Sequence, residues 1–285
     1  LLLFGTGEKM KKWLVRKPQK EFAEKILRES EVTPLCADIL AARGFTSAED
    51  AAKQLNSDGL SDPFLLKDMR EAADVINDAV ENFESICIYG DYDCDGITST
   101  VILFSYLECM GANVTYYIPE RSEGYGLNAD AVRELAKRGV NLIITVDNGI
   151  SAIEESKLIY ELGMRLVVTD HHQPGDELPQ AEAVVDPHRK DCPSTFKYLC
   201  GAGVALKLVA ALENGDYETA LNEYGEFAAM GTVADVVSLT GENRYIVSNG
   251  LRLLENSERP GVNALIKKSG LKFPLTSASL AFGLA

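Results

Sequence analysis

The chain alternates short β-rich runs with helical stretches from Ser85 to Asp170, and this alternation restricts the fold more than any other feature. The β-rich runs are ICIYG, NVTYYIP, NLIITV and RLVVT. Repeated strand–helix–strand units require a parallel sheet. The runs are almost continuously apolar, as expected when helices cover both faces. We therefore predict an α/β fold with a doubly wound, mostly parallel sheet, and expect a further short strand at AEAVVD.

Helical patterns, with apolar residues at three- and four-residue spacing, flank this region on both sides. They predict an N-terminal helical subdomain over residues 10–84, an α/β domain over 85–240 and a helical C-terminal part over 241–285. Ser47, with Asp50 three residues on, is expected to cap the third N-terminal helix. Residues 1–9 precede Met10, and we expect them to be an added tail.

The charge balance limits how the chain can meet nucleic acid. The formal net charge is −15, whereas sequence-independent affinity for phosphates comes from clustered Lys and Arg. A nucleic-acid partner would need carboxylates loaded with divalent cations, which invert the local field. Six cysteines form no C-x-x-C pair, and the apolar run from Leu1 to Phe4 is too short for a leader or a membrane span. We expect a reduced, cytoplasmic protein with no membrane partner.

Acidic residues follow the predicted strands at the end where parallel strands meet one rim of the sheet. They are Asp91, Asp93 and Asp95 after ICIYG, Asp147 after NLIITV, and Asp170 with His171 and His172 after RLVVT. A single Asp after a strand is usually a turn former or a helix cap. Capping, however, does not explain a D-x-D-x-D run or a tandem His pair. The sequence therefore predicts that carboxylates and imidazoles converge.

Such a convergence requires cations. Two carboxylates ~4 Å apart repel by roughly 1 kcal/mol in water and about 4 kcal/mol at an intermediate dielectric constant. Carboxylate oxygens with one or two imidazoles suit Mn²⁺ or Mg²⁺, whereas structural zinc prefers thiolates. Two ions about 4 Å apart that share a carboxylate would form a hydrolytic site for phosphate esters.

The chain resembles the Asp-His-His (DHH) phosphoesterases at these residues. The segments YGDYDCDGITS (89–99), TVDNGI (145–150), VVTDHHQP (167–174) and GTVADVVSL (231–239) are similar to the four motifs of that family, most of all to its RecJ exonucleases. The resemblance implies that residues 85–240 are the catalytic domain. It also implies that the chain stops before a DHH-associated domain and an OB-fold.

The resemblance implies a role for each motif residue. Asp93 and His171 would hold the first metal, Asp95 and Asp235 the second, and Asp147 would bridge them. Asp91, at the start of the D-x-D-x-D run, would bind or support the metal. Other members of the family often have His at the position of Tyr89, and the Tyr here departs from their pattern but fits that of the RecJ exonucleases. Asp170 would orient the imidazoles, and His172 would touch the scissile phosphate.

Further residues are candidates for substrate binding. Arg121 and Arg189 could contact phosphates, Tyr125 could stack on a base, and His188 could reach the substrate. For each of them the alternative is ordinary loop chemistry, and for His188 we favour polar surface. Two glycines, Gly201 and Gly203, open a helix whose free N–H groups could cradle a phosphate, with close helix packing as the alternative.

The resemblance favours a divalent-metal phosphodiesterase, a single-strand-specific 5′ to 3′ DNA exonuclease of repair and recombination. Single-stranded DNA would be its substrate, and a single-strand-binding protein or a helicase is a candidate partner. Two alternatives stay open. One is cleavage of short RNAs (a nanoRNase), cyclic dinucleotides or pyrophosphate by the same motifs, and the other is a catalytically silent DNA-binding scaffold.

Overall fold

The computed structural model describes residues 15–55 and 59–284, and these divide into two compact units between Ser57 and Asp58. Residues 1–9, expected to be a tail, lie outside the described part. In that part no helix has the length and apolar character needed to cross a membrane. Each unit is described by itself.

The first unit is a small cluster of helices: α1 (Lys20–Glu29), α2 (Pro34–Ala42) and α3 (Ala48–Leu55). A core that includes Ile26, Leu40 and Ala51 holds them together. The Ser47 Oγ accepts a hydrogen bond from the Asp50 N–H at 3.1 Å. The predicted cap of the third helix is therefore confirmed.

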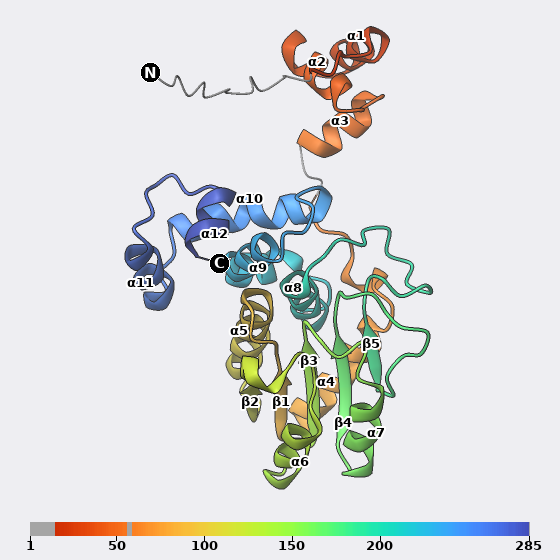
Figure 1. Ribbon diagram of the computed structural model, residues 1–285, viewed down its shortest axis with the longest axis vertical. Coiled ribbons are helices and arrows are strands. Elements are labelled where there is room, and N and C mark those ends of the chain that lie inside the picture. Colours follow the sequence, from red (N-terminus) through yellow and green to blue (C-terminus); the bar gives the residue numbers. More distant parts are fainter. Residues whose placement is uncertain (1–14, 56–58, 285) are drawn as a thin grey trace, which may run out of the picture. The chain divides into compact units, whose positions relative to one another are not determined.

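The second unit contains a five-stranded sheet in the order β2-β1-β3-β4-β5, and every neighbouring pair is parallel (Figure 1). The strands are β1 (Ile86–Tyr89), β2 (Val114–Tyr117), β3 (Leu142–Val146), β4 (Arg165–Thr169) and β5 (Ala183–Val185). The predicted α/β class and parallel sheet are confirmed. The β5 strand is the one expected at AEAVVD.

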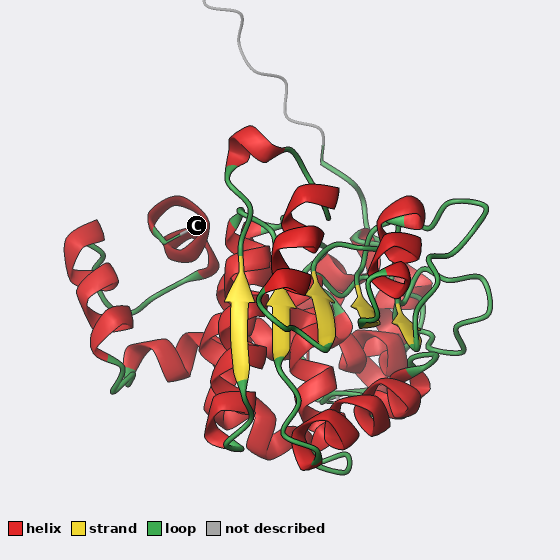
Figure 2. Ribbon diagram, turned by 90° about the horizontal axis from the view of Figure 1, so that it is seen from below, coloured by secondary structure: helices red, strands yellow, loops and turns green. Residues whose placement is uncertain are grey.

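Alternate side chains of these apolar strands enter two separate cores, because successive residues of a strand point to opposite faces. On one face Ile86, Ile88 and Ile144 pack under the helices α4 (Met69–Glu81), α5 (Cys94–Cys109) and α8 (Gly201–Leu212). On the other face Tyr89 and Ile143 pack under α6 (Ala129–Lys137) and α7 (Ile153–Glu161). Figure 2 shows helices on both sides of the row of strands.

Four helices follow: α9 (Tyr217–Ala234), α10 (Gly241–Glu255), α11 (Pro260–Ser269) and α12 (Ser277–Gly283). The α9 helix packs against α5 and α8 as well as α10, so the helical end belongs to the same compact unit as the sheet. A core that includes Met230, Val262 and Leu280 joins α9 to α11 and α12.

The predicted boundary at residue 84 differs from the division in the structure. The α4 helix lies in the second unit, where its Ala72 and Ile76 are fully or almost fully buried in the sheet's core. Its amphipathic pattern shows that it is a helix but not which surface it covers. The division at residue 240 remains a prediction.

A buried ion pair ties the start of the second unit to its later helices. Lys207, on α8, is 2% exposed, and its Nζ lies 2.6 Å from the Glu242 Oε2 on α10. The same Nζ donates hydrogen bonds to the Ser61 carbonyl and the Ser61 hydroxyl, both at 2.8 Å. Each charge is thus compensated in a site where both side chains are buried.

We expect Lys207→Ala to lower the free energy of unfolding by about 3–5 kcal/mol, because it leaves the buried Glu242 carboxylate without its counter-ion. Urea unfolding of the purified variants measures this. The double variant Lys207→Met, Glu242→Leu should recover most of the loss, since it removes both charges. A double variant as unstable as the single one would contradict this reading.

Candidate metal centre

The candidate site lies where the strand order of the sheet reverses. The chain enters at β1, adds β2 on one side, and then continues on the other side with β3 and β4. The loops that follow β1 and β3 therefore diverge at the carboxyl edge and leave a crevice between them. Asp91 to Asp95 follow β1, and Asp147 follows β3 directly. The sequence correctly placed the acidic run at the rim where parallel α/β sheets bind ligands.

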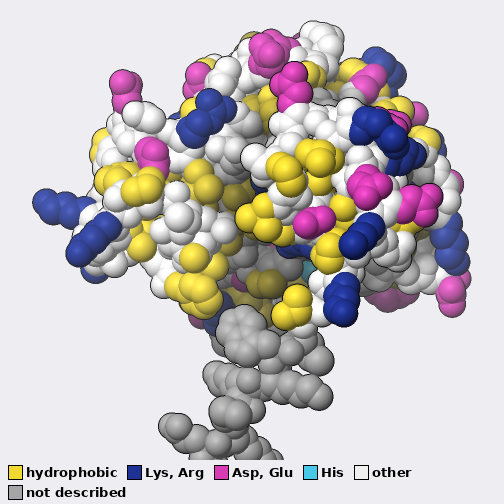
Figure 3. Space-filling model, turned by 90° about the horizontal axis from the view of Figure 1, so that it is seen from above, with side chains coloured by type: hydrophobic (Ala, Val, Ile, Leu, Met, Phe, Trp, Pro, Cys, Tyr) yellow, Lys and Arg dark blue, Asp and Glu magenta, His cyan; other side chains and the backbone are white. Residues whose placement is uncertain are grey.

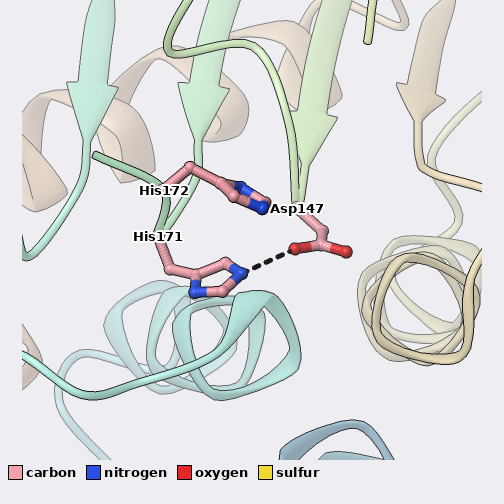
Figure 4. A group of neighbouring side chains, drawn as sticks. All are labelled: Asp147, His171 and His172. Carbon is pink, nitrogen blue, oxygen red and sulfur yellow. Dashed lines mark ion pairs between the residues drawn. The ribbon is translucent and has the colours of Figure 1, made fainter. Parts of the chain in front are cut away.

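The side chains fall into two sets that have no residue in common, and a third group connects them by bringing Asp147 together with His171 and His172. In one set, ligand atoms of Asp91, Asp93 and Asp147 lie within 4.8 Å of one another. In the other, ligand atoms of Asp95, His171 and Asp235 do so. The Asp147 Oδ1 is 3.0 Å from the His171 Nε2, as drawn in Figure 4, so Asp147 stands between the two sets.

This grouping differs from the pairing that the motifs implied, and that pairing stays a prediction. The His171 Nε2 lies 3.7 Å from the Asp95 Oδ2 and 3.8 Å from the Asp235 Oδ2, so His171 is grouped with these two acids. Asp91 takes the place beside Asp93. The sequence shows which residues reach the rim, but the direction of each side chain depends on the helices packed there.

Two glycines allow this close packing. A Cβ at Gly201, the first residue of α8, would lie 2.5 Å from the Cβ of Asp147. A Cβ at Gly231, on α9, would lie 2.6 Å from the Asp95 Oδ1. Any larger residue would push the helices away from the carboxylates. Asp147 itself has a φ of +62°, a left-handed conformation that costs a non-glycine residue free energy and is typical of functional sites.

The predicted phosphate cradle at Gly201 and Gly203 is not what the structure forms. The Gly201 and Ala202 N–H groups donate to the two Asp95 carboxylate oxygens at 2.6 and 2.9 Å, so Asp95 occupies the start of α8. Gly203 faces Leu199, whose Cδ2 would lie 3.0 Å from an added Cβ. Close packing, the alternative considered for these glycines, explains both of them.

The unpartnered ligand atoms and the shifted pKa values of the site are those expected where a cation binds. The Asp91 Oδ1, the Asp147 Oδ1 and the His171 Nε2 are buried and have no hydrogen-bond partner. Burial, together with the charges of Asp95 and Asp93, raises the pKa of Asp147 to about 12 and that of Asp235 to about 7. Burial lowers the pKa of His171, so its short contact with Asp147 is not a charged pair at neutral pH. Divalent cations would satisfy all three atoms at once.

The second histidine is held differently from the first. Asp170 is fully buried, and its Oδ1 accepts hydrogen bonds from the backbone N–H of His171 and from the His172 Nδ1, both at 2.7 Å. Its Oδ2 accepts from the Ile150 N–H at 2.9 Å. The contact with Asp170 raises the pKa of His172, whose side chain is 43% exposed. His172 can therefore present a positively charged ring to the crevice.

Tyr125 is brought to the site, but its hydroxyl is engaged there. The hydroxyl donates to the Asp147 carbonyl at 3.2 Å and lies 3.0 Å from the His172 Nδ1. Its ring meets that of His172 edge to face, with centroids 5.4 Å apart. Tyr125 thus positions His172 in this structure, and its proposed stacking on a base remains a prediction.

His188 and Arg189 turn out to support the structure. The His188 Nδ1 lies 2.6 Å from the His171 carbonyl, so His188 steadies the loop that carries the ligand. Arg189 is 7% exposed, and its guanidinium binds Asp68 and Asp191. The prediction that Arg189 contacts phosphate was therefore wrong, because the loop sequence shows Asp191 but not that Asp68 lies beside Arg189 as well.

Two buried polar residues at the rim escaped the sequence analysis. Asp186, directly after β5, is fully buried with an unpartnered Oδ2, and burial raises its pKa to about 7. It accepts a hydrogen bond from the His188 N–H at 2.6 Å. Asn148 donates to the Val146 carbonyl at 3.0 Å. The same strand-then-Asp pattern that revealed Asp147 could have revealed Asp186.

Comparison with known proteins identifies the family. The model of the DHH family, N-terminal domain, matches residues 85–232. The chain belongs to the DHH family. Among curated proteins it is similar to the single-stranded-DNA-specific exonuclease RecJ of Bacillus subtilis, with 44% identity over 91% of this chain and 33% of the relative. RecJ of Escherichia coli is 36% identical over 90% of this chain and 46% of the relative.

Solved DHH structures agree with the fold. The crystal structure of Thermus thermophilus RecJ in complex with Mn²⁺ matches with a TM-score of 0.80 and 32% identity, over 95% of this chain and 38% of that one. The same protein in complex with Mg²⁺ matches with a TM-score of 0.65 and 28% identity, over 95% of this chain and 35% of that one. The chain thus spans between a third and a half of the length of these RecJ relatives.

The raised pKa values predict how metal-free stability depends on pH. The carboxyl groups of Asp186 and Asp235 move from a reference pKa of 3.8 to about 7 on folding, so the folded chain binds more protons between these values. Stability with EDTA should therefore fall as pH rises from about 4 to about 7. Mn²⁺ at a hundredfold excess over its Kd should add roughly 2.7 kcal/mol and reverse the trend, since it binds carboxylates.

Thermal unfolding at pH 5 and pH 7.5, with EDTA and with Mn²⁺, tests this expectation. The variant Asp235→Asn should show a smaller difference between the two pH values in EDTA, because it cannot ionise. A melting temperature unaffected by Mn²⁺ at pH 7.5 would show that the acids do not form a cation site.

Proposed function

We propose that this chain is the catalytic core of a two-metal phosphodiesterase that releases nucleotides from single-stranded DNA. The observation that carries the proposal is the pair of carboxylate sets joined through Asp147, with buried ligand atoms that lack any other partner. Proteins named single-stranded-DNA-specific exonucleases share the family and 32–44% of their residues with the chain over most of its length. The 5′ to 3′ direction rests on that resemblance.

Each set would hold one Mn²⁺ or Mg²⁺ ion. Asp91 and Asp93 would bind the first, and Asp95, His171 and Asp235 the second, with Asp147 between them. Bound in this way, the pair would lower the pKa of a water molecule and stabilise negative charge on the phosphate. Oxygen-rich ligands with a single imidazole fit the hard cations named here.

The chain's own residues would orient the substrate's phosphate and offset its negative charge. Asp170 holds the His172 Nδ1 at 2.7 Å, whereas the His172 Nε2 has only a longer contact of 3.4 Å with the Tyr125 hydroxyl, so Nε2 is the ring atom better placed to turn toward a ligand. Because the pKa of His172 is raised, this atom can donate a hydrogen bond to a phosphate oxygen. A donor aimed at charge that grows in the transition state lowers the barrier.

The overall charge explains why the cations matter for binding as well. On the face of the molecule in Figure 3, basic and acidic side chains are interspersed rather than gathered in one basic field. With a net charge of −15, the chain has little general attraction for a phosphate backbone. Partners such as a single-strand-binding protein or a helicase, and a cytoplasmic location, remain predictions.

We expect Asp147→Asn to abolish Mn²⁺-dependent release of nucleotides while the protein stays folded. The substitution removes the carboxylate of the first set that also contacts His171 of the second, and it relieves the like-charge repulsion among Asp93, Asp95 and Asp147. The assay uses single strands labelled at either end, and the order of label release reports polarity. Short RNA, a cyclic dinucleotide and pyrophosphate are tested in parallel.

A matched control is Asp176→Asn, which changes an acid on the loop after His172 that belongs to neither set. It should cut like the wild type. If the wild type hydrolyses short RNA, a cyclic dinucleotide or pyrophosphate faster than single-stranded DNA, that compound and not DNA is the substrate. Binding of DNA without cleavage of any substrate would favour the silent scaffold instead.

A further inference from the structure

We propose that an apolar groove beside the metal centre receives the bases of the strand that is cut. The inference rests on the proposed function and names where its substrate lies. The groove, called here the α5–α11 groove, is a cavity of about 670 Å³ between α5, α9 and α11. Its walls are largely apolar, formed by Ile97, Val101, Phe227, Met230, Val262 and Leu265.

The groove is continuous with the metal centre. Asp93, an exposed member of the first carboxylate set, also lines the groove, next to Tyr92. From there Ile97, Val101 and Ser105 follow at four-residue spacing along α5, so they share one side of the helix. Ile97 to Ser105 extend over roughly 12 Å at 1.5 Å per residue. A strand whose phosphate lies at Asp93 would thus find room for more than one base.

Its charge differs from that of the chain as a whole. The lining contains Arg121 and Arg259 but a single acid, Asp93. Arg121 lies over the Tyr92 ring, 4.7 Å from its centroid, and makes no ion pair with any residue in 15–55 or 59–284. It is free to meet a phosphate near the metal centre. A phosphate backbone that the rest of this acidic surface would repel can therefore approach here.

The other guanidinium serves as a flat wall. Arg259 lies 5.2 Å from the Phe227 ring centroid, and its charge is offset by the Glu226 Oε1 at 3.0 Å. A planar guanidinium fixed over an aromatic ring, next to aliphatic side chains, offers a surface on which bases stack. Glu226 fixes the position of the Arg259 guanidinium. Because Glu226 also offsets its charge, Arg259 is not expected to bind phosphate strongly.

The groove has few groups that could read base identity. The Thr98 hydroxyl already donates to the Cys94 carbonyl at 2.8 Å, and the other hydroxyls in the lining are those of Ser105 and Tyr92. Base recognition requires donors and acceptors placed at base edges, whereas apolar and stacking contacts accept every base. The expected ligand is therefore single-stranded nucleic acid of any sequence, with its bases unpaired.

Ser105→Trp fills the far part of the groove without touching the metal centre. It should raise the KM for a 20-nucleotide deoxythymidine strand at least tenfold, yet leave hydrolysis of bis(4-nitrophenyl) phosphate with Mn²⁺ unchanged. A thymidine dinucleotide, which does not reach Ser105, should be cut at the wild-type rate. The matched control Ser248→Trp, on the exposed side of α10, should behave like the wild type.

A second pair of variants, at exposed positions, keeps the test valid if Ser105→Trp does not fold. Leu265→Glu places a carboxylate on the exposed rim of the groove, and Ala264→Glu places the same charge on the same helix outside the lining. Fluorescence anisotropy of the labelled 20-mer, with Ca²⁺ in place of Mn²⁺, measures binding without relying on cleavage. The first variant should bind at least tenfold more weakly than the second.

The outcomes separate this inference from the proposed function. Equal KM and equal affinity in the groove variants and their controls would overturn the groove while leaving the hydrolase in place. Equal affinity of the wild type for the 20-mer and for a 20-unit abasic strand would overturn it as well. Failure of every protein to hydrolyse either phosphate ester would refute the proposed function, whereas weaker strand binding by the groove variants alone would still support the groove.

Discussion

The rest of the structure depends on the burial of like-charged carboxylates against helix ends. Asp95 accepts two N–H groups from the first turn of α8, and Asp147 lies so close to that turn that residue 201 must be glycine. These contacts place α8 against the sheet's carboxyl edge, and α9 and α5 pack around it. The hydrophobic core therefore holds together acids that water would otherwise separate. The sheet holds the acids in place, and their buried negative charge must be offset by cations.

The two histidines divide the work because their surroundings differ. His171 is buried among acids, its Nε2 has no hydrogen-bond partner, and burial lowers its pKa, which suits a neutral metal ligand. His172 is half exposed, and Asp170 raises its pKa, which suits a donor to an anion. Adjacent residues thus acquire opposite protonation tendencies from Asp170 and from the depth of each ring.

The sequence predicted what depends on local pattern and missed what depends on distant partners. Strand runs followed by acids revealed β1, β3 and β4 and the residues at their ends, because parallel strands bring these ends together. Arg189 was misread, since one of its two acidic partners, Asp68, lies 121 residues away in the chain. Likewise, the amphipathic pattern of α4 could not show that it covers the sheet rather than the N-terminal helices. The grouping of His171 with Asp95 and Asp235 follows from the packing of α9, which no motif specifies.

The central claim is that two carboxylate sets joined through Asp147 bind two cations. Equilibrium dialysis against Mn²⁺, with electron paramagnetic resonance of the bound ions, measures both their number and their separation. The account predicts two ions per chain with a spectrum broadened by coupling between neighbouring Mn²⁺ centres, and one uncoupled ion in Asp235→Asn. One ion per wild-type chain, or two that show no coupling, would contradict it.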